Sequence, residues 1–421
     1  MVAYKWRQVS SLVSMPFIAV IVPAPLHGQV APSLEGDNLV LSRPRPGLDP
    51  TGFDFAGVTV FPGIDGSVGY DDNIYLDRSN KVSSGLLTIR PYLVASSDWS
   101  RDSLKMTATS TIERYTSKNS EDYETYDIDA SGRIDLLESV HFDGSGHYRR
   151  SIEARGSAGD LFTGGKPIHF YDRGGSGSAT VSLSKLDVTV GGDLSRITYA
   201  NARVGGETFS QGYRNRNYYA GTAKLSYSLS PAFQPFVQIS RENEHYDLRQ
   251  KQTSLDSTGT VALAGVNISL TKLLTGRVGF GYRWRGYRNP NYANSNGLTY
   301  DLALVWNPRT LVSVTIEAQK TIEESPQTGA SGIIDNEVSA RLDYEILRRL
   351  VLSGTVTGSV ENYRGMSRTD HRVSSLASIG YLMNRFIRLD INYDHEFQHG
   401  DGVFGRSYRG NRVGLTISIQ H

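Results

Sequence analysis

The sequence predicts an all-β fold: a transmembrane antiparallel up-and-down β-barrel of about 18 strands, with short periplasmic turns and long extracellular loops. Three observations support this prediction. Apolar and polar residues alternate with a period of two in one segment after another from Val58 onward, which is typical of strands with one apolar and one polar face. The connections alternate between short and long, as they do in outer-membrane barrels. No apolar run reaches the roughly 18 residues of a membrane-spanning helix.

Composition narrows the class further. The chain has 421 residues, of which 38% are hydrophobic, with 43 glycines and 24 tyrosines. This balance suits a transmembrane barrel, in which only alternate residues meet lipid. A formal charge of +1 gives no indication of nucleic-acid binding. The chain has no cysteine, so disulfides play no part in the argument.

The N-terminal region divides into two parts ahead of the barrel, which is expected over residues 58–421. Residues 1–28 are predicted to be a signal peptide, with Lys5 and Arg7 before a short apolar stretch. Residues 29–57 form either a periplasmic linker or a small plug. The segment Arg43-Pro44-Arg45-Pro46 is extended because proline fixes its backbone. In the plug alternative, both arginines would meet carboxylates of the lumen.

The strands are expected in order along the chain. Their predicted spans are 58–70, 85–97, 102–116, 122–136, 139–151, 170–184, 186–200, 213–230, 232–246, 255–270, 273–287, 296–307, 310–324, 333–347, 349–363, 369–384, 385–400 and 406–420.

The connections are predicted to alternate strictly, short on the periplasmic side and long outside. Long loops include 71–84, 152–169, 201–212, 247–254, 288–295 and 325–332. An even number of strands places both chain ends on the periplasmic side.

Four strands alternate clearly enough for their facing to be assigned. Apolar residues such as Phe280 and Ile391 should face lipid, because an arginine or lysine at mid-bilayer costs roughly 2–4 kcal/mol. The charged residues between them should line the lumen. These are Arg277, Arg283, Arg285, Glu317, Glu337, Arg341, Asp343, Glu345, Arg388, Asp390 and Asp394. They form either an ion-pair lattice that stiffens the wall or a transverse field that sorts solutes.

Aromatic residues near the strand ends predict two interfacial belts. Trp99, Tyr227, Trp306 and Phe386 adjoin short turns, and Tyr70, Tyr148, Tyr246, Trp284 and Tyr363 adjoin long loops.

The last strand alternates to the end of the chain. Arg412, Gly414, Ile417 and Ile419 resemble the C-terminal signal that the outer-membrane barrel assembly machinery reads, although the chain ends in His421 rather than the usual aromatic residue. The alternative is an ordinary edge strand. A strand that closes a barrel leaves no edge exposed.

Two motifs suggest chemistry and neither is well supported. His395-Glu396-Phe397-Gln398-His399 matches a zinc-protease pattern, which needs a helix for both histidines to reach one metal. Here it continues an alternating strand. Asp71, Asp72, Asn73 and Asp77 are a weak calcium candidate without EF-hand spacing. The sequence predicts no catalytic residue, cofactor or metal, and therefore no enzyme.

Several short stretches spread over residues 43–421 carry a family resemblance. They are Arg43-Pro44-Arg45-Pro46-Gly47-Leu48-Asp49-Pro50-Thr51-Gly52, Gly69-Tyr70-Asp71-Asp72-Asn73-Ile74-Tyr75, Ser97-Asp98-Trp99-Ser100-Arg101, Tyr227-Ser228-Leu229-Ser230-Pro231, Trp306-Asn307-Pro308 and Asn384-Arg385. The sequence resembles the putative beta-barrel porin 2 family of Gram-negative outer-membrane proteins, whose members are often associated with exopolysaccharide production. The resemblance implies a porin-like or export role and no catalytic residue.

Two functions are therefore expected as alternatives. The first is a channel that serves exopolysaccharide export across the outer membrane of a Gram-negative bacterium. Its partners would be outer-membrane lipid, the polysaccharide and periplasmic export proteins, and no nucleic acid. The second is a structural or adhesive barrel with a closed lumen. The long loops decide between them, by folding inward or standing outward with Arg155, Lys166, Arg203, Arg214 and Arg216 in or beside them.

Overall fold

The computed structural model describes residues 39–421 except 163–164, 248–253, 271–272 and 328. The predicted signal peptide lies outside the described residues. Among those described, no helix is long and apolar enough to cross a membrane.

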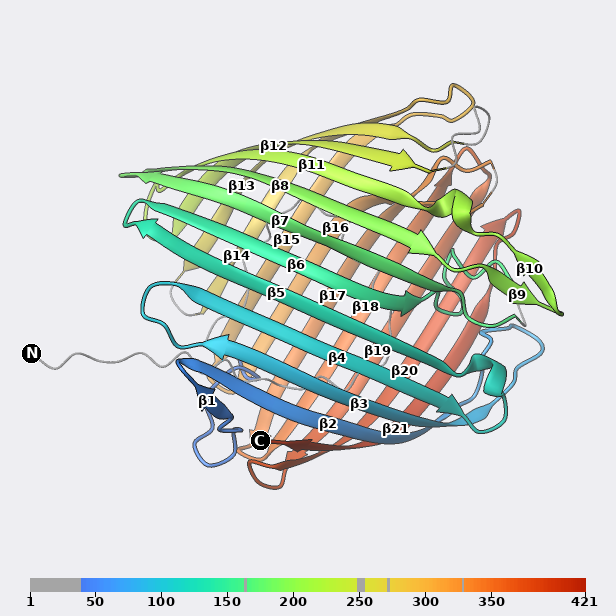
Figure 1. Cartoon of the computed structure of the whole chain (residues 1–421), viewed down its shortest axis with the longest axis horizontal. Coiled ribbons are helices and arrows are strands. Elements are labelled where there is room, and N and C mark those ends of the chain that lie inside the picture. Colours follow the sequence, from blue (N-terminus) through green and yellow to red (C-terminus); the bar gives the residue numbers. More distant parts are fainter. Residues whose placement is uncertain (1–38, 163–164, 248–253, 271–272, 328) are drawn as a thin grey trace, which may run out of the picture.

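The described chain is a closed antiparallel β-barrel of eighteen strands, as the sequence predicts (Figure 1). The barrel strands are β2 (Val58–Asp71), β3 (Ser84–Ser97), β4 (Ser103–Tyr115), β5 (Tyr123–Leu137), β6 (Val140–Ile152), β7 (His169–Leu183), β8 (Leu186–Tyr199), β11 (Arg216–Tyr227), β12 (Phe233–Tyr246), β13 (Ser257–Leu270), β14 (Leu274–Tyr287), β15 (Ser295–Arg309), β16 (Val312–Glu323), β17 (Gly332–Leu347), β18 (Leu350–Arg364), β19 (Arg368–Leu382), β20 (Ile387–Gly402) and β21 (Tyr408–Gln420).

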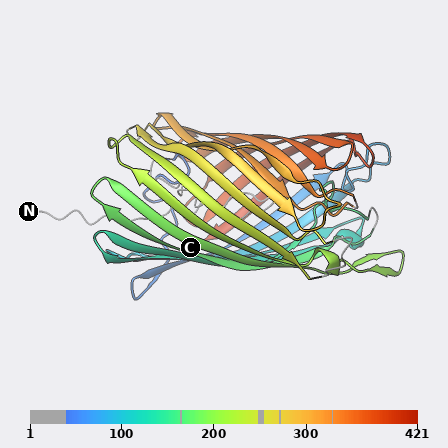
Figure 2. The same cartoon turned by 90° about the horizontal axis from the view of Figure 1, so that it is seen from above.

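Five short elements lie outside the barrel wall. β1 (Phe53–Phe55) pairs only with the start of β2. β9 (Ala202–Val204) and β10 (Glu207–Phe209) form a hairpin that projects beyond the rim (Figures 1 and 2). The 3₁₀ turns η1 (Asn119–Glu121) and η2 (Gly212–Arg214) lead into β5 and β11.

The last strand closes the barrel by pairing with β2. Ile419 lies opposite Ile64, and Arg412 lies opposite Asp71. This pairing satisfies the backbone N–H and C=O groups that a terminal edge strand would otherwise leave unpaired. Ile417 and Ile419 point outward, whereas Arg412 and Gly414 belong to the inner face. Whether these residues direct assembly stays a prediction.

The outer surface carries the apolar side chains that alternation predicts. Val237, Phe280, Val356, Ile391 and Leu415 are all more than two-fifths exposed, so the outside of the barrel presents a band suited to lipid.

Aromatic side chains mark both margins of this band, with two corrections. Trp99, beside a short turn, is 48% exposed, and Trp284, near a long loop, is 47% exposed. Tyr246 and Tyr363, predicted for the outer belt, are instead each 3% exposed and face the lumen. Tyr246 lies two residues after the inward-facing Glu244 on the same strand, so it points to the same side. Its position in the alternating pattern therefore sets its direction, and its closeness to a loop does not.

The two ends of the barrel differ in their connections. Both described chain ends lie at the short-turn end, where Gln420 N–H donates to Phe386 and Val40 N–H donates to Ser313. Strict alternation of loop length was wrong for the last hairpins. The connection after β18 is only residues 365–367, although it belongs to the long-loop end. Gly365, with φ of +92°, permits this tight turn.

Candidate functional site

The lumen is the candidate site, and the structure places the charged residues proposed for it on the inner face of the wall. Three of them are buried arginines of β14 that form two separate groups of ion pairs. Arg277 is 1% exposed and pairs with Asp301 at 3.2 Å. Arg283 and Arg285 both reach Glu242, at 3.0 and 3.2 Å. These arginines are neutralised by carboxylates on nearby strands, not by acids across the lumen.

Two further arginines pair along their own strands. Arg341 lies 2.8 Å from Asp343, and Arg388 lies 2.6 Å from Asp390. Residues two apart on a strand share a face, which explains both contacts. Glu317, Glu337 and Asp394, also proposed, form no ion pair within 4 Å among the described residues. Their influence on solutes stays a prediction.

The N-terminal segment, residues 39–50, folds into the short-turn mouth. Arg45 is buried and donates to Val40 O at 2.7 Å and to Glu345 at 3.2 Å. Val40 and Leu48 are also buried. Arg45, Leu48, Val351 and Leu382 line one small cavity. The segment therefore meets the inner wall, with one of its two arginines on a lumen carboxylate.

We expect Arg45→Ala to release the N-terminal segment, because the buried Glu345 loses its partner. Breaking a buried ion pair costs about 3–5 kcal/mol, and every 1.4 kcal/mol is tenfold in an equilibrium. In a Val40→Cys background, Arg45→Ala should speed maleimide labelling by on the order of tenfold or more. Arg43→Ala removes the same charge and is the control. Equal labelling of both variants would contradict this contact.

A second segment, the lumen loop (residues 153–168, of which 163–164 lie outside the described residues), enters the barrel between β6 and β7. Its ends are held together where Glu153 N–H donates to Ile168 O at 2.8 Å. Arg155 pairs inside the loop with Asp160 at 2.9 Å, and with Glu121 of η1 at 2.7 Å. These side chains are largely buried, so the loop is fixed by desolvated charges and not by a few surface contacts.

The lumen loop reaches the far wall. Arg372 of β19 donates to Gly156 O at 2.9 Å, and Arg406, before β21, pairs with Asp160 at 2.8 Å. Ala158 packs against a buried cluster that includes Ile333 of β17 and Tyr363 of β18. In the ring of strands, β17 and β18 lie opposite β6 and β7. The loop therefore crosses the lumen near the long-loop end.

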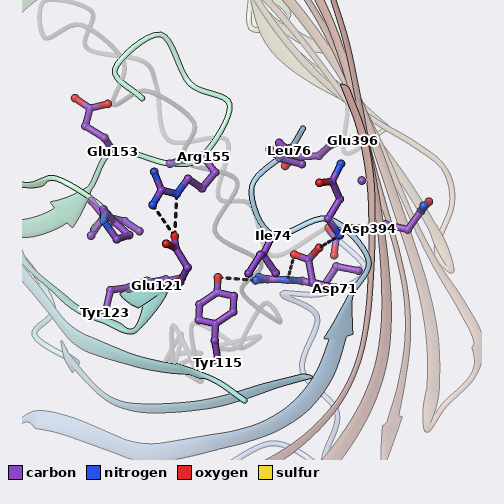
Figure 3. A pocket seen from close by; sticks show the side chains of 17 residues that line it. Asp71, Ile74, Leu76, Tyr115, Glu121, Tyr123, Glu153, Arg155, Asp394 and Glu396 are labelled. Atoms are coloured by element: carbon purple, nitrogen blue, oxygen red, sulfur yellow. Dashed lines mark hydrogen bonds and ion pairs between the residues drawn. The ribbon is translucent and has the colours of Figure 1, made fainter. Parts of the chain in front are cut away.

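A cavity of about 110 Å³ lies between the lumen loop and the wall (Figure 3). Tyr115, Glu121 and Arg155 line it from one side, and Asp394 and Glu396 from β20. The cavity is thus rich in carboxylates.

The mouth clamp (Glu153, Arg214, Arg216 and Glu324) joins three connections at the long-loop end. Arg214 pairs with Glu153 at 2.6 Å and with Glu324 at 3.0 Å, and Arg216 reaches Glu324 at 2.9 Å. Burial alone would raise the pKa of Glu324, but the two arginines outweigh it and hold that pKa below its ordinary value. Glu121 shows the opposite balance, since burial outweighs Arg155 and raises its pKa.

These shifts predict a pH dependence. Because the pKa of Glu324 is lowered, the clamp's stability is fully present above the ordinary Glu pKa and lost as pH falls through the lowered one. The contribution of Glu121 to docking has the opposite pH dependence. Its pKa is raised in the docked state, so its protonation in acid favours docking. Loop cleavage by an acid-tolerant protease, from neutral to about pH 3, should rise in acid. Glu324→Gln should flatten that profile and Glu121→Gln should steepen it. Identical profiles for the wild type and for Glu324→Gln would refute the clamp.

The two motifs weighed for metal chemistry are explained by the fold. His395 and His399 lie on strand β20, not on a helix. Asn73 N–H donates to Asp71, and Asn411 N–H donates to Asp72, so these acids organise the first long loop. Within the described residues, no group of three His, Cys, Asp or Glu side chains could hold a metal ion.

Comparisons with known proteins agree with the closed barrel. The family model described as Putative beta-barrel porin 2 matches residues 45–421, so the chain belongs to that family. It is a porin-like β-barrel channel of the outer-membrane class. A search of the curated proteins found no match.

Three solved structures match the chain at low identity. OpdL of Pseudomonas aeruginosa is 12% identical over 87% of this chain and 99% of its own, with a TM-score of 0.42. OccAB3 of Acinetobacter baumannii is 9% identical over 87% of this chain and 100% of its own, with a TM-score of 0.44. OccK2 of P. aeruginosa, solved with glucuronate, is 10% identical over 88% and 100%, with a TM-score of 0.44.

Proposed function

We propose that this protein is a channel in the outer membrane of a Gram-negative bacterium that serves exopolysaccharide export. The observation that supports a channel function is the composition of the inner wall, which is lined by polar and charged side chains along its length. The exposed Glu317 on the inner face indicates that part of the lumen is open to water. The polysaccharide rests on the family's association with exopolysaccharide production.

The inner wall also holds five tyrosine rings near the long-loop end, and four of them are only 3–4% exposed, so they could meet a sugar only after a rearrangement. Tyr199, Tyr218, Tyr246, Tyr363 and Tyr408 share inward parity with neighbouring lumen residues. Aromatic faces pack well against the apolar faces of sugar rings. The lumen loop covers part of this surface, with Tyr408 beside Gly156. Export of a polymer would therefore require the loop to move.

The second candidate is a closed structural or adhesive barrel. It is favoured by the two segments that fold inward, the lumen loop and the N-terminal segment, while the β9–β10 hairpin stands outside (Figure 2). Purified protein in planar bilayers separates the two candidates. The channel predicts stepwise conductance in the wild type or after loop deletion. Silence in both would favour the closed barrel.

Export itself needs a cellular test. A strain lacking this chain should keep polysaccharide inside the envelope and release little to the medium. Release should return with the wild-type gene and not with a folded variant whose lumen is blocked. Unchanged release in the deletion strain would exclude the export role while leaving the channel intact.

A further inference from the structure

Charge is distributed unevenly between the lumen and the rest of the molecule. The formal net charge is only +1. Yet each arginine that faces the lumen from the described strands already lies within 4 Å of a carboxylate. These arginines are Arg90, Arg133, Arg149, Arg216, Arg277, Arg283, Arg285, Arg341, Arg368, Arg372, Arg388 and Arg412.

Lys224 of β11 is also on the inner face and forms no ion pair among the described residues. Several carboxylates elsewhere on the inner face likewise remain without a basic partner. We call five of these the acidic wall: Glu317 on β16, Asp335 and Glu337 on β17, and Asp394 and Glu396 on β20. Among the described residues, none of the five lies within 4 Å of a lysine, arginine or histidine nitrogen. The exposed Glu317 gives this side of the lumen a negative potential, whereas the buried Asp335 and Asp394 favour the charged form only when a cation pairs with them.

Two of these carboxylates are buried with an oxygen that accepts no hydrogen bond. Asp335 and Asp394 are each 5% exposed, and Asp335 Oδ1 and Asp394 Oδ2 have no partner among the described residues. A buried charge without a partner is costly. Asp394 lines the 110 Å³ cavity beside Glu396 (Figure 3). The nearby Arg412 is already held by Asp71 and Glu113.

The remaining guanidinium near the wall is also engaged. Arg372 lies 3.6 Å from Glu361, donates to Gln398 at 3.0 Å, and holds the lumen loop through Gly156 O. Asp335, Glu337 and Glu361 lie close enough to act electrostatically on one another, and Arg372 is the one arginine that acts on Asp335 with them.

We propose that the lumen selects cations, and that the transported polymer is neutral or carries protonated amines. This inference rests on the proposed channel function. An ammonium group donates up to three hydrogen bonds and can satisfy the open oxygens of Asp335 and Asp394. A uronate-type polymer would meet like charge at every step. The acidic wall thereby narrows the substrate class that the family alone leaves open.

The first test is the reversal potential of purified protein in planar bilayers under a KCl gradient. The wild type should be cation-selective, with a several-fold preference for K⁺ over Cl⁻ that weakens at high salt. Replacing the acidic wall with isosteric amides (Glu317→Gln, Asp335→Asn, Glu337→Gln, Asp394→Asn and Glu396→Gln) should remove most of that preference. Glu207→Gln, on the external hairpin, is the matched control and should change nothing.

Glu317→Gln alone guards against misfolding of the combined variant, because Glu317 is already exposed within the lumen. It should lower the preference for K⁺ measurably. An unselective or anion-selective wild type would overturn the proposed cation selectivity, while the proposed channel function would remain. Silence of both wild type and loop-deleted protein would instead overturn the channel.

The second test uses oligosaccharides as blockers of the same current. A glucosamine hexamer should block at much lower concentration than an N-acetylglucosamine hexamer, and an oligogalacturonate should block least. The amide variant should lose the difference between the first two. Stronger block by the oligogalacturonate would show that the acidic wall does not set the substrate class.

Discussion

Removing the lumen loop should raise single-channel conductance several-fold. The loop crosses from β6–β7 to the opposite wall at β17–β19, so it occupies the cross-section through which ions must pass. Deleting residues 155–166 and joining the ends with Asn-Gly is feasible, because Glu153 and Ile168 are already hydrogen-bonded as in a hairpin. Glu153 stays in place to preserve its contact with Arg214.

The matched control replaces the exposed loop tip at residues 78–81 with glycine and serine. That tip lies at the same end of the barrel and is solvent-exposed, so conductance should not change. Both proteins must show the heat-dependent gel shift of a folded barrel. If the loop deletion leaves conductance at the wild-type value, the loop does not limit the pore.

Glu324→Ala should release the mouth clamp, with an effect almost as large. Glu324 accepts hydrogen bonds from Arg214, Arg216 and Tyr199. Without it, two buried arginines lose their shared carboxylate, although Arg214 keeps Glu153. Breaking such a buried arrangement costs about 3–5 kcal/mol. We expect the docked loops to open while the barrel itself stays folded, since Glu324 and Arg214 lie beyond the strand ladders.

Limited proteolysis of the folded protein measures this release. Cleavage within residues 153–168 should become faster by on the order of a hundredfold if about 3 kcal/mol is lost. Glu207→Gln removes a carboxylate from the exposed hairpin and should leave the rate unchanged. Matching rates for the two variants would mean that Glu324 does not hold the loops.

The barrel itself was predictable because its rules are local. Period-two alternation located each strand to within a few residues, and the same parity put Arg277 and Asp390 inside. The wrong predictions concern side-chain direction at positions that were assigned by their closeness to a loop and not by the alternating pattern. Tyr246 and Tyr363 were assigned to the outer belt because they adjoin long loops, whereas parity turns them inward.

The lumen loop could not be derived from the sequence. Its contacts join residues far apart in the chain, such as Gly156 with Arg372 and Asp160 with Arg406. The basic residues in the long loops were visible, but their partners depend on which way each loop folds. The N-terminal segment posed the same problem, because Arg45 meets Glu345 only after the barrel has closed.

Loop-to-wall cross-linking tests most directly whether the lumen loop spans the barrel. The chain has no cysteine, so Ala158→Cys with Met366→Cys supplies a unique pair on the loop and the far rim. A short bis-maleimide should join them within one folded molecule, detected by mass spectrometry. The pair Gly206→Cys with Met366→Cys, using the external hairpin, should not react. A folded barrel in which Ala158→Cys fails to cross-link would contradict a loop that crosses the lumen.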